Sequence, residues 1–136
     1  MVGIDSNILL RILLADVVAA QDAPDQFSLV RSLVADSKER FFVNHIVIVE
    51  TIWVLRQKLK HGNDAIRRQV QRLLKMSNVE VQDSATVAAA LESFEAYPGD
   101  FSDHMIGQIN RQNGCRTTYT FDRAASKSPH FSELKR

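Results

Sequence analysis

The chain has 136 residues, of which 45% are hydrophobic and 24% charged, and its formal net charge is +1. This length and composition are typical of a soluble globular protein, so we expect one domain over residues 1–136. No apolar run approaches the roughly 20 residues of a membrane-spanning helix. The N-terminus lacks the basic region of a secretory signal, and the single cysteine, Cys115, excludes an intrachain disulfide. These features predict a cytoplasmic protein without a membrane anchor.

Apolar patterning predicts strands that alternate with helices along the chain. In chain order, the predicted elements are a buried strand at 1–5, a helix at 26–37, a strand at 40–43, an ambiguous segment at 45–55, a helix at 63–76, a strand at 79–81, helices at 84–97 and 100–114, and a strand at 115–121. This alternation is typical of an α/β domain with a parallel sheet.

Two of these elements depend on single residues. In "HIVIVETIWVL" at 45–55, Val and Ile favour a strand, whereas the length of the run and Asn44 as an N-cap favour a buried helix. Ser84 is the predicted cap of the helix at 84–97.

The small net charge conceals a separation of charges. Residues 56–75 hold seven Lys or Arg and one acid, whereas residues 76–103 hold six acids and no Lys or Arg. Two solvated helix faces explain this pattern, and so does a basic surface for a polyanion beside an acidic site.

Acidic residues stand where two predicted strands end. Asp5 ends the first strand and Asp122 follows "TTYTF". Sites in parallel α/β sheets lie beyond the carboxyl ends of the strands, so we expect these two aspartates to be neighbours. The alternative for each is an Asx-turn or helix cap, with Arg123 as a surface partner of Asp122.

Three further acids have unusual settings. Glu50 is the only charged residue between Arg40 and Arg56, so we expect either a buried ion pair, an acid that lines a groove, or an ion ligand. Asp100 and Asp103 stand at i and i+3 across a predicted helix start, which is also the pattern of a capping box.

Convergence of these acids would require a cation. Two unit charges about 4 Å apart repel by about 4 kcal/mol at an effective dielectric constant of 20. Oxygen ligands suit Mg²⁺ or Mn²⁺, and the four histidines show no paired zinc spacing. We expect His104 to be a core or surface residue, although it neighbours Asp103.

Four motifs in order resemble those of PIN-domain nucleases, and at this size the VapC-type toxins of type II toxin–antitoxin pairs. They are "GIDSNILLR", "VIVETIWVL", "GDFSDHMIGQIN" and "YTFDRAASK". The resemblance implies a three-layer α/β/α domain with a parallel sheet of about five strands. It also implies Mg²⁺- or Mn²⁺-dependent endoribonuclease activity.

The resemblance also implies roles for individual residues. The catalytic and metal-binding residues would be Asp5, Glu50, Asp103 and Asp122. Asp100 would be an auxiliary acid or a cap, and Ser6, Asn7 and Thr120 would orient the acids or a water molecule. His104 departs from the small residue common at its position, which leaves open whether it narrows the substrate channel.

The expected partners are RNA, a cognate antitoxin and a second copy of the chain. RNA contacts are expected from Arg11, Arg56, Lys58 and Lys60, with Arg67, Arg68 and Arg72 as further candidates. Three alternatives stay open: a phosphorylation receiver domain, a PIN module that binds without cleaving, and a PIN nuclease of RNA maturation or decay.

Overall fold

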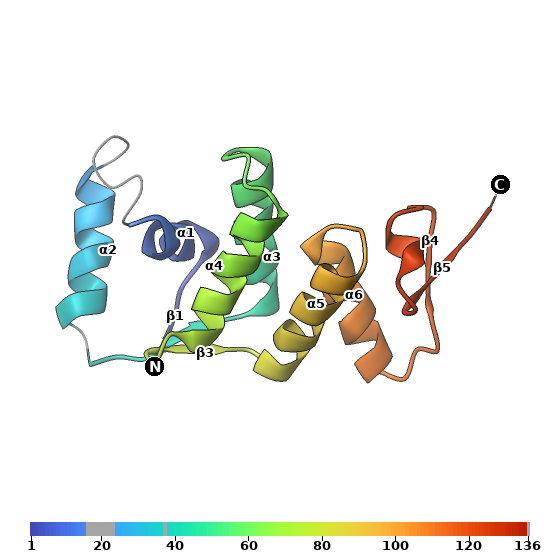
Figure 1. The fold of residues 1–136 in the computed structure, drawn as a ribbon. Helices are drawn as coiled ribbons and strands as arrows, with labels where there is room; N and C mark the ends of the chain where they lie inside the picture. Colours follow the sequence, from blue (N-terminus) through green and yellow to red (C-terminus); the bar gives the residue numbers. More distant parts are fainter. Residues whose placement is uncertain (16–23, 37, 136) are drawn as a thin grey trace. The chain divides into compact units, whose positions relative to one another are not determined.

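The computed structural model describes residues 1–15, 24–36 and 38–135, which divide into two compact units, Met1–Gln82 and Asp83–Arg136 (Figure 1). Each unit has its own helices and its own parallel strands. No helix in the described part of the chain is long and apolar enough to cross a bilayer. The single domain expected over 1–136 stays a prediction.

The first unit combines a small parallel sheet with four helices. Its elements are β1 (Val2–Gly3), α1 (Ser6–Leu14), α2 (Pro24–Asp36), β2 (Phe41–Val43), α3 (His45–Gln57), α4 (Asn63–Lys75) and β3 (Val79–Val81). The strands lie in the order β1-β2-β3, and both pairings are parallel. Phe41 and Val43 of the central strand are fully buried because β2 has a neighbour on each side.

Helix α1 packs against both α2 and α3 and so connects the first unit (Figure 1). Leu9 of α1, Ile48 and Leu55 of α3 and Ile66 and Val70 of α4 are all fully buried. Burying such side chains stabilises a fold by about 1.5–3 kcal/mol each. This core fixes the position of Asp5, the acid that directly precedes α1.

The ambiguous segment at 45–55 is the helix α3. Asn44 is its N-cap, and Asn44 Oδ1 accepts a hydrogen bond from the backbone N of Val47 at 2.9 Å. The cap satisfies one of the free amides of the first turn, so it outweighs the strand preference of the Val and Ile residues.

The second unit is a helical hairpin followed by a pair of strands. Its elements are α5 (Ser84–Ala96), α6 (Phe101–Gln112), β4 (Thr118–Thr120), the 3₁₀ helix η1 (Ala125–Lys127) and β5 (Phe131–Glu133). Helices α5 and α6 pack together, and the rings of Phe94 and Phe101 meet edge to face at 5.9 Å. Strand β4 pairs parallel with β5.

The α/β class and the parallel pairing are confirmed, and several details differ. The five strands pair as one sheet of three and one of two in the described residues. The sequence analysis predicted no helix at the position of α1 and no strand at the position of β5. The first strand is not buried, because β1 lies at the edge of its sheet and Val2 is 40% exposed. The predicted end of the second helix, Ser37, lies outside the described residues.

The N-cap of α5 is Asp83, not Ser84. Asp83 adopts the left-handed conformation with φ +42°, and Asp83 Oδ2 accepts a hydrogen bond from Thr86 Oγ1 at 2.6 Å. Ser84 is the first helical residue. Aspartate tolerates this conformation better than most residues, which explains why the helix begins one residue after it.

Helix α6 and β5 meet at Gly107, so Gly107→Val is expected to destabilise the second unit. A Cβ at Gly107 would stand 2.7 Å from Cε2 of the buried Phe131 ring and 3.4 Å from His130 Cβ. Overpacking of this kind costs about 1–3 kcal/mol in the free energy of unfolding, which urea denaturation would measure. The matched control is Gly3→Val, because a Cβ at Gly3 meets nothing within 4 Å. Equal stability of the two variants would contradict this packing.

Candidate active site

Asp5 lies between β1 and α1 and caps the helix. Asp5 Oδ1 accepts a hydrogen bond from the backbone N of Ile8 at 3.1 Å. The capping alternative of the sequence is therefore confirmed for this residue. The side chain is exposed, and no described residue bonds its Oδ2, so capping does not prevent Asp5 from binding a cation.

Glu50 lies on α3 and faces solvent, so of the alternatives for this acid the buried ion pair is wrong. The apolar side of α3 consists of Val47, Ile48, Thr51, Ile52 and Leu55, and helical spacing places Glu50 on another face. Glu50 Oε2 accepts a hydrogen bond from Ser6 Oγ at 3.3 Å. Because Ser6 directly follows Asp5, this bond brings Asp5 and Glu50, the N-terminal pair, into one region of the first unit.

Asp100 and Asp103 form a capping box at the start of α6, as one interpretation of the sequence predicted. Asp100 is the N-cap, and its backbone N donates to Asp103 Oδ2 at 3.1 Å. Asp103 is only partly exposed, whereas Asp100 is exposed. The box fixes the rotamer of the Asp103 side chain.

Asp122 follows β4 and is held by backbone amides. Its Oδ1 accepts from Ala124 N at 2.8 Å and from Ala125 N at 3.3 Å. Thr120 Oγ1 accepts from the backbone N of Asp122 at 3.0 Å, so Thr120 lies where it orients this acid. Arg123 does not pair with Asp122, because it extends to Glu133 at 3.9 Å.

Asp103 and Asp122 influence each other electrostatically and form the C-terminal pair. Burial raises the pKa of the Asp103 carboxyl, and the negative charges of Asp122 and Asp100 raise it further. The hydrogen bond from the Asp100 amide opposes these effects. A cation between the two carboxylates would relieve both the desolvation and the repulsion.

His104 is a core residue, as expected from the sequence. Its side chain is 1% exposed, lies edge to face with Phe94 at 6.0 Å, and places Nε2 3.1 Å from the carbonyl oxygen of Pro98. Burial lowers the pKa of this histidine. Nothing in these contacts makes His104 a wall of a substrate channel.

Gly99 is a residue whose importance the sequence analysis missed. Its φ is +111°, and a Cβ there would lie 3.5 Å from His104 Nε2 and 3.6 Å from Asp103 Oδ2. The dipeptide Pro98–Gly99 directly follows the predicted helix at 84–97 and precedes Asp100. The same dipeptide in front of the acid signals a turn that only glycine adopts without strain.

The predicted metal ligands occur as two pairs, one in each unit. No group of three or more His, Cys, Asp or Glu side chains suited to a metal ion occurs in residues 1–15, 24–36 and 38–135. All four predicted ligands present carboxylate oxygens, which suit Mg²⁺ or Mn²⁺. The chemistry of the donors fits such an ion, and convergence of the two pairs stays a prediction.

Two of the four predicted RNA-binding residues have structural contacts. Arg11 donates to the carbonyl oxygen of Asn7 at 2.9 Å and to Gln26 Oε1, and its guanidinium lies 5.5 Å from the centre of the Phe27 ring. Arg56 donates to the carbonyl oxygen of His61 at 3.2 Å and to Asn63 Oδ1. Lys58 and Lys60 are exposed.

The chain is similar to a solved structure and to a family of known domains. The crystal structure of Mycobacterium tuberculosis VapC20, a toxin that cleaves the sarcin–ricin loop, aligns over 100% of both chains with 19% sequence identity and a TM-score of 0.45. No curated protein matches the chain. The model of the PIN domain family matches residues 2–129. The chain therefore belongs to the PIN domain family.

Proposed function

We propose that the chain is a Mg²⁺- or Mn²⁺-dependent endoribonuclease that hydrolyses RNA phosphodiester bonds. The observation that carries this proposal is the family match over residues 2–129, which includes Asp5, Glu50, Asp103 and Asp122. The two acid pairs support it, because each pair has a local arrangement that holds its carboxylates in place. The family match also favours this activity over that of a phosphorylation receiver.

The proposed mechanism assigns a task to each held carboxylate. Asp5, Glu50, Asp103 and Asp122 would hold one or two divalent ions. Such an ion lowers the pKa of a water molecule and shields the charge that develops on the phosphate. Asp103 or Asp122 would orient the attacking water or take its proton. Thr120 and the amides of Ala124 and Ala125 would fix Asp122, and Ser6 would fix Glu50.

The proposed biological role is that of a toxin in a type II toxin–antitoxin pair. The partners would be RNA, a cognate antitoxin and a second copy of the chain, and the location would be the cytoplasm. The alternatives are a nuclease of RNA maturation or decay and a PIN module without cleavage. A neighbouring gene for a small DNA-binding protein would favour the toxin.

The test is cleavage of total RNA by the chain purified without any partner. We expect cuts at a limited set of sites in Mn²⁺ or Mg²⁺ and none in EDTA, because chelation removes the cation that the four carboxylates require. Sequencing of the new RNA ends would identify the target. Cleavage that persists in EDTA would refute metal dependence. A folded, metal-binding chain that cleaves no RNA would favour the non-catalytic module.

A further inference from the structure

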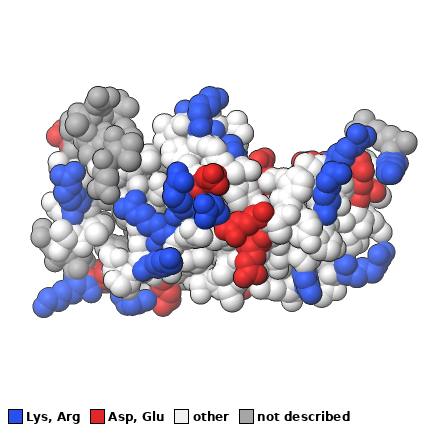
Figure 2. Space-filling view, in the orientation of Figure 1, with Lys and Arg blue, Asp and Glu red and all other residues white. Residues whose placement is uncertain are grey.

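Helix α4 has a groove on its exposed side that contains no predicted catalytic residue. Arg68, Gln71, Arg72, Lys75 and Met76 line this basic groove, which has a volume of about 430 Å³. Its lining includes three cations and no acid. Figure 2 shows Lys and Arg side chains gathered over α4.

Two of the three cations of the basic groove, Arg68 and Lys75, have no acidic partner within the described residues. Arg67 pairs with Asp64 at 3.8 Å on the same helix. Arg68 and Lys75 have no ion-pair or hydrogen-bond partner within the described residues. The charges of Arg68 and Lys75 are therefore available to an external anion.

Helix stability explains this arrangement only in part, because Asp64 stands four residues before Arg68 at a stabilising spacing. Arg68, Arg72 and Lys75 stand at i, i+4 and i+7, so they share one face, and like charges at this spacing destabilise a helix. The helix dipole favours Arg72 and Lys75 in the last turn, but it does not favour Arg68 in the middle. An anionic ligand would compensate the repulsion.

Arg72 connects the basic groove to the helix that begins at Asp5. Its NH1 donates to the carbonyl oxygen of Leu13 at 2.9 Å, near the end of α1. Asp5 caps the other end of α1, eight residues away, a length of about 12 Å at 1.5 Å per residue. A polymer that contacts Asp5 therefore needs to extend only a short way along α1 to reach the groove.

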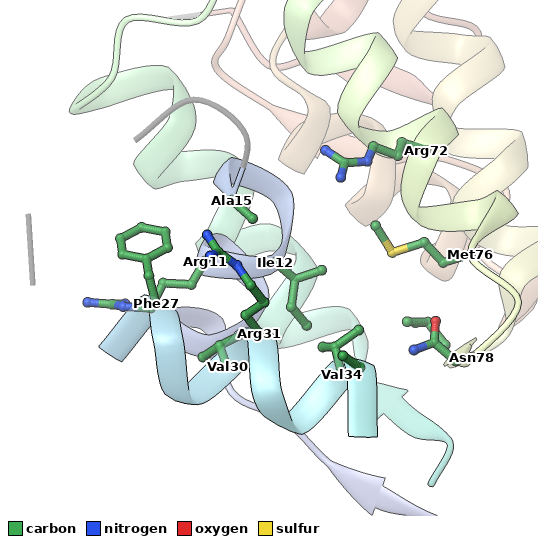
Figure 3. A pocket seen from close by; sticks show the side chains of 12 residues that line it. Arg11, Ile12, Ala15, Phe27, Val30, Arg31, Val34, Arg72, Met76 and Asn78 are labelled. Carbon is green, nitrogen blue, oxygen red and sulfur yellow. The ribbon is translucent and has the colours of Figure 1, made fainter. Parts of the chain in front are cut away.

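Arginines also line a second hollow, whose other lining residues are mostly apolar. Arg72 and Met76 line this hollow of about 300 Å³ between α1, α2 and α4. Figure 3 shows Arg11 and Arg31 at this hollow, with Arg72 on its α4 side. A ligand that follows the arginines would cross from α4 to α2.

We propose that the basic groove binds the phosphates of single-stranded RNA outside the cleavage site; this inference rests on the proposed nuclease function. The stripe from Arg68 to Lys75 is about 10 Å long, enough for about three phosphates of a stacked strand at 3.4 Å each. Arg68 and Lys75, two long cationic side chains beside the apolar Met76, suit a flexible polyanion better than a folded protein surface.

The test compares RNA binding by two triply substituted proteins of equal net charge. Both carry Asp5→Asn to prevent cleavage, because Asn caps a helix as well as Asp does. R68Q/K75Q removes two free cations of the groove, whereas R40Q/R67Q removes two cations that are paired with Glu80 and Asp64. The probe is a fluorescent 20-nucleotide single-stranded RNA, titrated by anisotropy at several salt concentrations.

We expect R68Q/K75Q to make the plot of the logarithm of the binding constant against the logarithm of the salt concentration less steep, by about 1.4. Each phosphate contact of a single strand contributes about 0.7 to this steepness. The control pair should change the slope by less than half of that amount. Equal slopes in the two proteins would overturn the proposal. So would unchanged RNA binding together with weaker binding of a labelled oligoglutamate peptide, which would make the groove a protein-docking surface.

Failure of the proposed function is distinguishable from failure of this inference. Cleavage by the chain with intact Asp5 is measured separately in Mn²⁺. A chain that binds RNA through the groove but cleaves none would refute the proposed nuclease function and support the proposal that the groove binds phosphates. A chain that cleaves RNA with the same KM with or without R68Q/K75Q would support the nuclease function and overturn the proposal that the groove binds RNA.

Discussion

Asp103→Asn is expected to reduce RNA cleavage by about 10²–10⁴-fold, the range that a positioned acid or base contributes. Asparagine keeps the oxygen that accepts from the backbone N of Asp100, so the start of α6 should be preserved. Only the charge next to Asp122 is lost. Single-turnover cleavage of a mapped RNA site in Mn²⁺ would measure the effect.

Asp100→Asn is the matched control for this substitution. It removes one negative charge from the same helical turn, and Asn is an equally good N-cap. We expect a loss of less than about tenfold, because Asp100 is exposed and acts here as the cap. Equal losses in the two variants would make Asp100 a ligand in its own right. Full activity of Asp103→Asn would leave Asp103 with the capping role alone.

The sequence predicted local structure well wherever one residue satisfies a nearby backbone group. Asn44, Asp100 and Asp5 all precede helices, and each was recognised as a possible cap. Such interactions span three residues and depend on no distant contact. The sequence analysis assigned no element to helix α1, although the polar residues Asp5, Ser6 and Asn7 separate its apolar run from the first strand.

The structural details that the sequence analysis predicted wrongly or missed depend on contacts between distant segments. Glu50 has apolar neighbours in the sequence, but the direction in which α3 faces its core places it in solvent. The three residues of β5 contain Ser132 and Glu133, so no apolar pattern marks them, and their pairing with β4 defines the strand. Composition cannot report a pairing of this kind.

The same difference between local contacts and contacts of distant segments applies to the candidate site. Sequence motifs predicted the acids and Thr120 as site residues, and the contact of Thr120 is local, because its hydroxyl oxygen accepts from the backbone N of Asp122 two residues away. The bond between Ser6 and Glu50 joins residues 44 positions apart and could not be foreseen from spacing. The basic groove of α4 likewise required the structure, which pairs Arg67 with Asp64 but gives Arg68 and Lys75 no partner within the described residues.

Mn²⁺ is expected to stabilise the chain through both acid pairs. At a concentration about 100 times its Kd, a ligand that binds only the native state raises the free energy of unfolding by about 2.7 kcal/mol. If the N-terminal and C-terminal pairs hold the same ion, Asp5→Asn and Asp122→Asn should each remove most of this stabilisation. Thermal unfolding with and without Mn²⁺ would measure it, with Asp64→Asn, an acid paired with Arg67, as the control.

This comparison separates a shared site from two independent ones. Asp5 belongs to the unit Met1–Gln82 and Asp122 to the unit Asp83–Arg136, so an ion bound by both carboxylates would stabilise both units together. Repulsion among four carboxylates makes such a site unfavourable without its cation, which predicts a large loss from removal of any one ligand. Loss of the Mn²⁺ effect in only one of the two variants would confine the metal to one pair and contradict the four-acid site.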